Sequence, residues 1–363
     1  MKKINLINYK NYYIYFKVFN AYIVDNKIKK QALFDRKKIS FSSYMRCSKV
    51  ENKTTRKIYK ILCDEFNMKY IDLKTLNLIE EKLNELYFEA YYKIDRDYSN
   101  DFIWLDELID SKITIFPLLI LFKLFILLNE KTPKEIVKKY KNLFDEIEKY
   151  KEFYIDEIKE IYLLLELVFR DESLIKYKSV CENELINQIL ATKFFVKGNY
   201  NTGLVYAQQA EKQFINSKNY IRAIMVNLTI MACYNESKLY GKTFNLAKQH
   251  YYSLKGFDKC EKELDLVKLH YVLSCIGLEK YKLALKMLLT KEAFNLNDAV
   301  SYIVIFKKMK ENINWNELTS RIYKYKNLDE ILDILKAFYA DEGDIKEFII
   351  QNNLSKVFLN LLS

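Results

Sequence analysis

Helix-breaking residues are scarce in this chain, and their scarcity limits the possible folds more than any other feature of the sequence. Two prolines, Pro117 and Pro133, occur in 363 residues, and all six glycines follow residue 197. Apolar residues recur at spacings of three and four nearly throughout, which is typical of helices with one buried face. Over residues 75–92, the side chains that this spacing places on one face are Leu76, Leu78, Ile79, Leu83, Leu86 and Phe88. Because strand-like alternation between Gly or Pro turns is not evident, we expect an all-α fold.

The second half of the chain contains an internal repeat. Three connectors end in tyrosine, 40 and 41 residues apart: Gly198-Asn199-Tyr200, Lys238-Leu239-Tyr240 and Glu279-Lys280-Tyr281. The residues three and seven positions after these tyrosines, mostly small ones, are Gly203, Thr243 and Ala284, then Ala207, Ala247 and Leu288. This pattern resembles the tetratricopeptide repeat, in which antiparallel helix pairs stack because no pair buries its own apolar face. The resemblance implies a right-handed helical solenoid over 71–363, with its clearest repeats in 184–295 and capping or dimerisation helices at its C-terminal end.

The positive charge of the protein is concentrated at one end. Residues 1–70 carry 17 Lys and Arg against five Asp and Glu, whereas the whole chain has a net charge of +11. The remaining residues therefore carry a net charge of −1. A basic segment on a neutral body indicates contact with a polyanion, with nucleic acid expected before an anionic membrane.

The basic segment contains a helix-turn-helix pattern. We predict helices around 27–35, 41–50 and 54–66, with Ser40 as the N-cap of the second. The turn Ile39-Ser40, followed by Tyr44 and Cys47 four and seven positions after the serine, resembles the DNA-binding helices of lambda-repressor-like regulators. Lys38 stands where that family usually has glycine. The resemblance implies a DNA-binding domain over 1–70.

The expected DNA contacts follow from this register. A recognition helix needs polar and basic side chains on its outer face, and flanking cations bind phosphates. The residues that we predict to bind DNA are Lys37, Lys38, Ser40, Phe41, Ser42, Ser43, Arg46, Lys49, Lys53 and Arg56.

Together, the two modules resemble the peptide-responsive regulators of the Rap, Rgg, NprR, PlcR and PrgX type, which include the phage arbitrium receptors; Rap proteins lack the DNA-binding module. The resemblance implies a cytoplasmic homodimer that binds double-stranded DNA and regulates transcription. It also implies a short signalling peptide, as in quorum sensing or phage lysis–lysogeny decisions, bound in the groove of the repeats. Asn and Gln side chains suit an extended peptide backbone, since they donate and accept together. The predicted peptide contacts are Asn187, Gln188, Thr192, Asn227 and Asn235.

Other functions are less compatible with the sequence. His250 and His270 are the only histidines, no glycine-rich phosphate motif occurs, and the six cysteines form no CxxC pair. We therefore expect no catalytic residue, no metal and no cofactor, and reduced, buried thiols. The apolar segment 113–128 is too short to span a bilayer and is expected to be a buried or interface helix. Two alternatives remain open: a repeat scaffold for a protein partner, with a head that contacts RNA or membrane, and a phosphatase of the Rap kind.

Overall fold

The computed structural model describes residues 12–47, 53–154, 156–170, 182–257, 260–352 and 354–362. Within these ranges it contains twenty α-helices, a single-turn 3-10 helix and no β-strand. The only extended pairings in the described chain are two isolated bridges, Lys69 with Ile113 and Phe294 with Ile322. The all-α prediction is confirmed.

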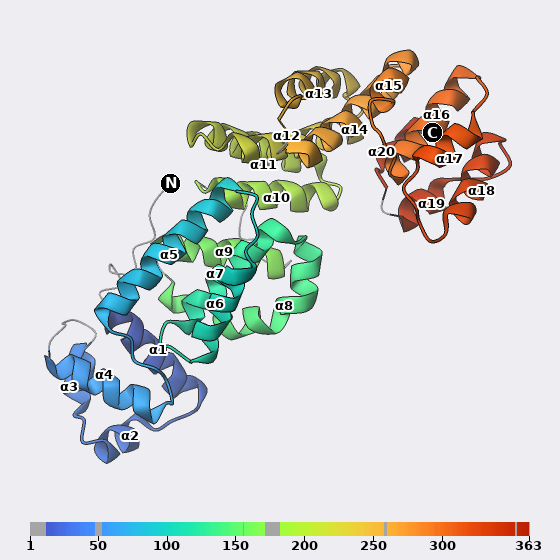
Figure 1. Ribbon diagram of the computed structural model, residues 1–363. Helices are drawn as coiled ribbons and strands as arrows, with labels where there is room; N and C mark the ends of the chain where they lie inside the picture. The colour runs from blue at the N-terminus through green and yellow to red at the C-terminus, as the bar shows by residue number, and fades with distance from the viewer. Residues whose placement is uncertain are drawn as a thin grey trace. The chain divides into compact units, whose positions relative to one another are not determined.

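The chain forms two compact units, Met1–Ile189 and Leu190–Ser363 (Figure 1). The division falls inside helix α10, Glu184–Val196. The expected domain boundary at residue 70 lies within the first unit.

The first unit holds the basic segment and five further complete helices. Its elements are α1 (Tyr12–Asp25), α2 (Lys30–Arg36), α3 (Phe41–Cys47), α4 (Lys53–Glu65), α5 (Leu73–Tyr92), α6 (Ser99–Asp110), α7 (Phe116–Glu130), α8 (Pro133–Glu148), the 3-10 helix η2 (Lys151–Phe153), α9 (Asp156–Phe169) and the start of α10. Aromatic contacts join α1 to α4: Phe34 of α2 and Phe16 of α1 lie 4.7 and 4.9 Å from Tyr44 of α3 between ring centroids. Phe19 of α1 lies 5.7 Å from Tyr59 of α4.

Helix α7 is the buried centre of the first unit, and it contains most of the apolar segment noted in the sequence. Residues Pro117 to Phe122 and Leu124 to Leu127 are all buried, and α7 contacts α5, α6, α8 and α9. Its one basic side chain, Lys123, forms an ion pair with Asp106 of α6. The prediction of a buried helix is confirmed. None of the described helices is both long enough and apolar enough to cross a membrane.

The basic segment that contains α1 to α4 contacts the rest of the first unit. The backbone N–H of Lys69 donates to the carbonyl of Lys112 at 3.0 Å, and the ammonium of Lys149 lies 3.2 Å from a carboxylate oxygen of Asp25. Between α4 and α5, Met68 and Ile71 are buried. The junction near residue 70 is therefore a packed segment rather than an open linker.

The predicted apolar face of α5 was wrong at two positions. Four of the six apolar residues assigned to one face of α5 are buried, but Leu78 and Phe88 are 59% and 45% exposed. The α5 helix turns 100° per residue, so these two side chains lie off the buried stripe, and the remaining apolar stripe is narrower than the one predicted.

The second unit continues with helices of similar length and then with shorter ones. Its elements after α10 are α11 (Tyr200–Asn216), α12 (Tyr220–Glu236), α13 (Tyr240–Leu254), α14 (Glu261–Gly277), α15 (Tyr281–Leu288), α16 (Leu296–Met309), α17 (Trp315–Arg321), α18 (Leu328–Tyr339), α19 (Lys346–Gln351) and α20 (Val357–Leu362). Neighbouring helices from α11 to α15 pack on each other, and α12 also contacts α14 (Figure 1).

The three tyrosine-ending connectors are turns of one geometry, as the repeat predicts. Each places a left-handed residue just past a helix end, at Gly198, Lys238 and Glu279. The tyrosine that follows is the first residue of α11, α13 or α15. The sequence pattern missed a fourth copy, in which Lys218 has φ of 59° and α12 begins at Tyr220. In all four turns, two backbone N–H groups bond back to the preceding helix, which satisfies its last carbonyls.

The small repeat positions lie where helices approach closely. Gly203, Thr243 and Ala284 are buried, as are Ala207, Ala247 and Leu288. A β-carbon at Gly203 would lie 3.1 Å from the carbonyl oxygen of Ala191 and 3.2 Å from the backbone nitrogen of Phe195. The predicted role of these positions in helix packing is confirmed.

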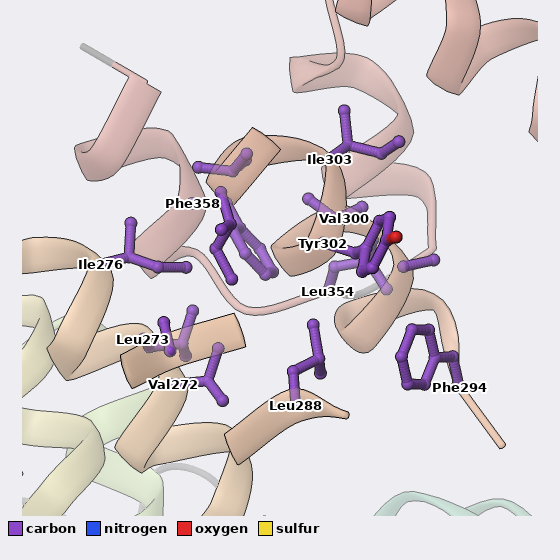
Figure 2. Packing of buried hydrophobic residues seen from close by; sticks show 14 of the residues in the cluster. Val272, Leu273, Ile276, Leu288, Phe294, Val300, Tyr302, Ile303, Leu354 and Phe358 are labelled. Carbon is purple, nitrogen blue, oxygen red and sulfur yellow. The ribbon is translucent and has the colours of Figure 1, made fainter. Parts of the chain in front are cut away.

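The last helices close a common apolar core with α14 and α15. Figure 2 shows side chains of α14, α15, α16 and α20 converging, among them Ile276, Leu288, Val300 and Phe358. The six-residue α20 contacts α12 and α14, and the Asn360 amide donates to Glu236 at 3.4 Å.

Candidate nucleic-acid interface and repeat face

The turn between α2 and α3 has a left-handed residue at the position where the resemblance expects glycine. Lys38 has φ of 56°, its N–H donates to the carbonyl of Asp35, and the N–H of Ile39 donates to the carbonyl of Phe34. Lysine adopts this conformation at an energetic cost that glycine does not have. The turn thus contains a left-handed residue at position 38 although no glycine is present there.

Ser40 caps α3, as predicted. Its Oγ accepts the N–H of Ser43 at 3.1 Å and donates to the Ser43 hydroxyl at 2.7 Å. The Ser42 hydroxyl lies 3.2 Å from the same Oγ. These three serines thus form one local network at the start of the helix.

Helix α3 divides into the two faces that its register predicts. Tyr44 and Cys47 are buried, whereas Phe41, Ser42 and Arg46 are exposed. Ser43 is half-buried, and Met45, which the sequence did not single out as a contact, is 43% exposed. The outer face of α3 is therefore a mixture of apolar, hydroxyl and guanidinium groups.

The predicted phosphate-binding cations differ in their surroundings. Lys37 and Arg36 both pair with Glu65 of α4, and the Lys37 ammonium lies 2.6 Å from a Glu65 oxygen. Lys38 and Arg56 are exposed. Lys49 lies outside the described residues, and Lys53 begins α4 with a side chain that the structure does not describe. Among the predicted DNA contacts, the exposed cations that the structure describes are Lys38, Arg46 and Arg56.

The predicted peptide contacts lie on α10 and α12, and most are buried. Asn187 and Gln188 precede the division between the two units; Asn187 is fully buried and Gln188 half-buried. Thr192, on the other side of that division, is exposed. The first unit therefore holds two of the five residues.

Asn227 and Asn235 occupy the interior of α12 in the second unit. Nδ2 of Asn227 donates to Glu211 of α11 at 2.8 Å and to the carbonyl of Ala223 at 3.0 Å. Nδ2 of Asn235 lies 3.3 Å from Nδ1 of His270 on α14. The Oδ1 atoms of both asparagines are buried without a hydrogen-bond partner in the described chain. A buried acceptor without a donor costs free energy, so each position calls for an explanation.

The partners Glu211 and His270 were not anticipated from the sequence. Glu211 lies 16 positions before Asn227, and His270 lies 35 positions after Asn235. Neither spacing produces a local signal, because helix packing alone brings these residues together. Burial lowers the pKa of His270 to about 4, so its imidazole is neutral at physiological pH. Burial also lowers the pKa of His250, and the Glu211 carboxylate opposes this shift.

The described residues hold no group of three or more His, Cys, Asp or Glu side chains placed to bind a metal ion. Cys47, Cys63, Cys233 and Cys275 are buried free thiols, Cys260 is a half-buried one, and Cys181 lies outside the described residues. Comparison with models of protein families, with curated proteins and with solved structures found no match. The structure thus shows an all-helical protein. Helices α1 to α4 lie in the basic segment, and most later helices pack on their neighbours in the chain.

Proposed function

We propose that this protein is a DNA-binding transcriptional regulator whose repeat helices respond to a short peptide. The observation that carries the proposal is the arrangement of α2 and α3. A left-handed turn and a serine cap precede α3, in which Tyr44 and Cys47 are buried. Met45 and Arg46 of the same helix are exposed. Placed in a segment with a net charge of +12, this geometry suits a helix that enters the major groove.

The proposal can be tested by titrating the full chain into a fluorescent duplex of random sequence at several salt concentrations. Binding through phosphates should weaken steeply between about 50 and 200 mM salt, because each contacted phosphate releases counterions. Substituting both Lys38 and Arg46 by alanine should lower the affinity by about tenfold at low salt.

The matched control is Lys308→Ala, which removes an exposed lysine of the second unit. Its affinity for the duplex should stay within twofold of the wild type. Equal losses in both variants, or no binding of any duplex by the folded wild type, would reject DNA binding. Point variants are preferred to removal of residues 1–70, because that deletion would uncover the surface of the first unit on which α1 and the 66–71 segment pack.

The peptide part of the proposal is supported by the two buried amide oxygens of α12. Asn227 and Asn235 each use Nδ2 within the second unit, and neither Oδ1 has a donor among the residues that the structure describes. An extended peptide offers backbone N–H groups at regular intervals. These groups would donate to the two Oδ1 atoms once α12 and its neighbouring helices move slightly apart. A homodimer, with two α3 helices spaced one DNA turn apart, completes the proposal.

A library of short random-sequence peptides provides the probe for this part. Peptides retained by the wild type should bind Asn227→Ala and Asn235→Ala at least tenfold more weakly, since each variant loses an acceptor. Gln249→Ala, at an exposed position of α13, is the matched amide control. If no peptide is retained, or if all three variants retain the same peptides, the repeat helices have another role.

A further inference from the structure

We propose that Phe41 and Met45 determine the DNA sequence that this protein recognises, by contacting the C5-methyl groups of thymines in the major groove. This inference rests on the proposed function, and it names the bases that α3 reads. Phe41 and Met45 are 47% and 43% exposed. They are four residues apart, so both lie on one face of α3, a single helical turn from each other.

The serines of α3 are less suited to reading bases than their position in the sequence indicates. Ser40, Ser42 and Ser43 are linked hydroxyl to hydroxyl, and Ser40 also accepts the N–H of Ser43. The Ser40 hydroxyl donates its proton to Ser43, so Ser42 is the donor in its contact with Ser40, and both hydroxyls can meet a base edge only as acceptors. The outward side chains of α3 that are not part of this network are Phe41, Met45 and Arg46.

The ring of Phe41 is held in place from one side. Its centroid lies 5.9 Å from that of Phe34, a fully buried ring of α2, with the two planes at 44°. Phe34 in turn packs against Tyr44. An aromatic ring supported in this way loses little conformational freedom when its open face is covered, which favours its use as a contact.

The charges around this apolar pair indicate which partner covers it. Lys38 precedes it in the turn, Arg46 follows it on α3, and Arg56 and Lys57 are exposed on α4. The acids on either side of it in the sequence are Asp35, which accepts from the Gln31 amide, and Glu51, which lies outside the described residues. Glu65 of α4 is paired with Arg36 and Lys37. An apolar pair within a cationic surface is complementary to the thymine methyls of a duplex, which lie in a groove between rows of phosphates.

The test begins with the full chain and a random-sequence duplex library, from which bound duplexes are enriched. In the enriched duplex, each dT is replaced singly by dU, which removes the methyl group and leaves every hydrogen-bonding atom in place. At one or two positions per half-site, the wild type should lose about fourfold in affinity per methyl, the value expected for burial of one such group.

The variants then assign each methyl to a side chain. Phe41→Ala should bind the dT and dU duplexes equally at one of these positions, and Met45→Ala should do so at the other. Arg46→Ala, the control on the same helix, should weaken binding and keep the full dT-to-dU difference. Circular dichroism checks that the variants fold, and the wild-type measurements stand even if one of them does not.

Three results would overturn the inference. Sequence-specific binding with no effect of any dT-to-dU change would mean that α3 reads other groups, while DNA binding itself would stand. A change of oligomeric state in Phe41→Ala, without a change in methyl sensitivity, would assign the pair to contact between copies of the chain. Failure of the wild type to enrich any duplex would reject both this inference and the proposed function.

Discussion

The side-chain amide of Asn235 on α12 lies 3.3 Å from Nδ1 of His270 on α14. An amide nitrogen only donates, so Nδ1 of His270 must accept, and it can do so only while that nitrogen carries no proton. Burial acts in the same direction by lowering the pKa of His270 to about 4. The contact therefore joins α12 and α14 through a neutral imidazole.

The first prediction is a loss of stability on acidification that depends on His270. Its folded pKa of about 4 lies below its ordinary value of 6.5, so above pH 6.5 the residue is neutral in both states and stability is insensitive to it. Between pH 6.5 and 4 the unfolded chain binds a proton that the folded chain excludes. The free energy of unfolding should therefore fall by about 2 kcal/mol between pH 7 and 4.5.

Urea unfolding of the wild type and of His270→Gln at both pH values measures this contribution. Carboxylates also titrate in this range, so the quantity of interest is the difference between the two proteins. The variant should lose about 2 kcal/mol less than the wild type on acidification. Parallel pH profiles for the two proteins would show that His270 is not excluded from protonation by the fold.

A second prediction concerns the close approach of α10 and α11. Gly203→Leu should lower the free energy of unfolding by about 2 kcal/mol, because its side chain meets the backbone at Ala191 and Phe195, which cannot move aside. Gly241→Leu is the matched control, in the first turn of α13, where a β-carbon meets nothing within 4 Å. This control should be neutral or slightly stabilising, since leucine favours helix more than glycine does. Equal effects of the two substitutions in urea unfolding would contradict the packing role of Gly203.

The sequence allowed the prediction of local structure much better than that of contacts between helices. The turns at Tyr200, Tyr240 and Tyr281, the cap at Ser40 and the buried face of α3 depend on residues within about one helical turn. Their signals are therefore present in short stretches of sequence. The turn before Tyr220 falls halfway between two connectors that are 40 residues apart, so a period of 40 does not predict it.

The candidate sites were predictable to a smaller extent. The burial of Asn187 and Asn235 and the pairing of Lys37 with Glu65 arise from helices that are distant in sequence. The division inside α10 also has no mark in composition. Periodicity identifies which face of a helix is apolar, but it does not identify which helix covers that face.

A third prediction concerns a buried ion pair in the C-terminal part of the second unit. The Lys291 ammonium donates to both oxygens of Asp298, at 2.9 and 3.0 Å, and both side chains are almost fully buried. Lys291→Met would leave the Asp298 carboxylate buried without its cation and should destabilise the protein by about 3 kcal/mol. Combining it with Asp298→Asn should recover part of this loss, because the charge is then absent from both positions.

The control for this pair is an exposed one. Lys336 and Asp333 lie 3.8 Å apart with most of their surface in solvent, so Lys336→Met should change the free energy of unfolding by less than about 0.5 kcal/mol. Guanidinium unfolding of the wild type and these three variants gives the comparison. If Lys291→Met and Lys336→Met lower the free energy of unfolding by the same small amount, the buried pair stabilises the protein no more than the exposed pair does.

The last prediction separates stability from DNA binding at a single position. Lys38 and Lys218 occupy equivalent left-handed positions after α2 and α11, with φ of 56° and 59°. Glycine adopts this conformation without the steric cost of a β-carbon, although it gains more freedom in the unfolded chain. Both Lys38→Gly and Lys218→Gly should therefore raise the free energy of unfolding by about 0.5 kcal/mol. Only Lys38→Gly should weaken duplex binding and reduce its salt dependence, because only Lys38 belongs to the basic head. Anisotropy titrations at two salt concentrations measure the duplex affinity of both variants. Equal affinities of Lys38→Gly and Lys218→Gly would contradict the proposed interface.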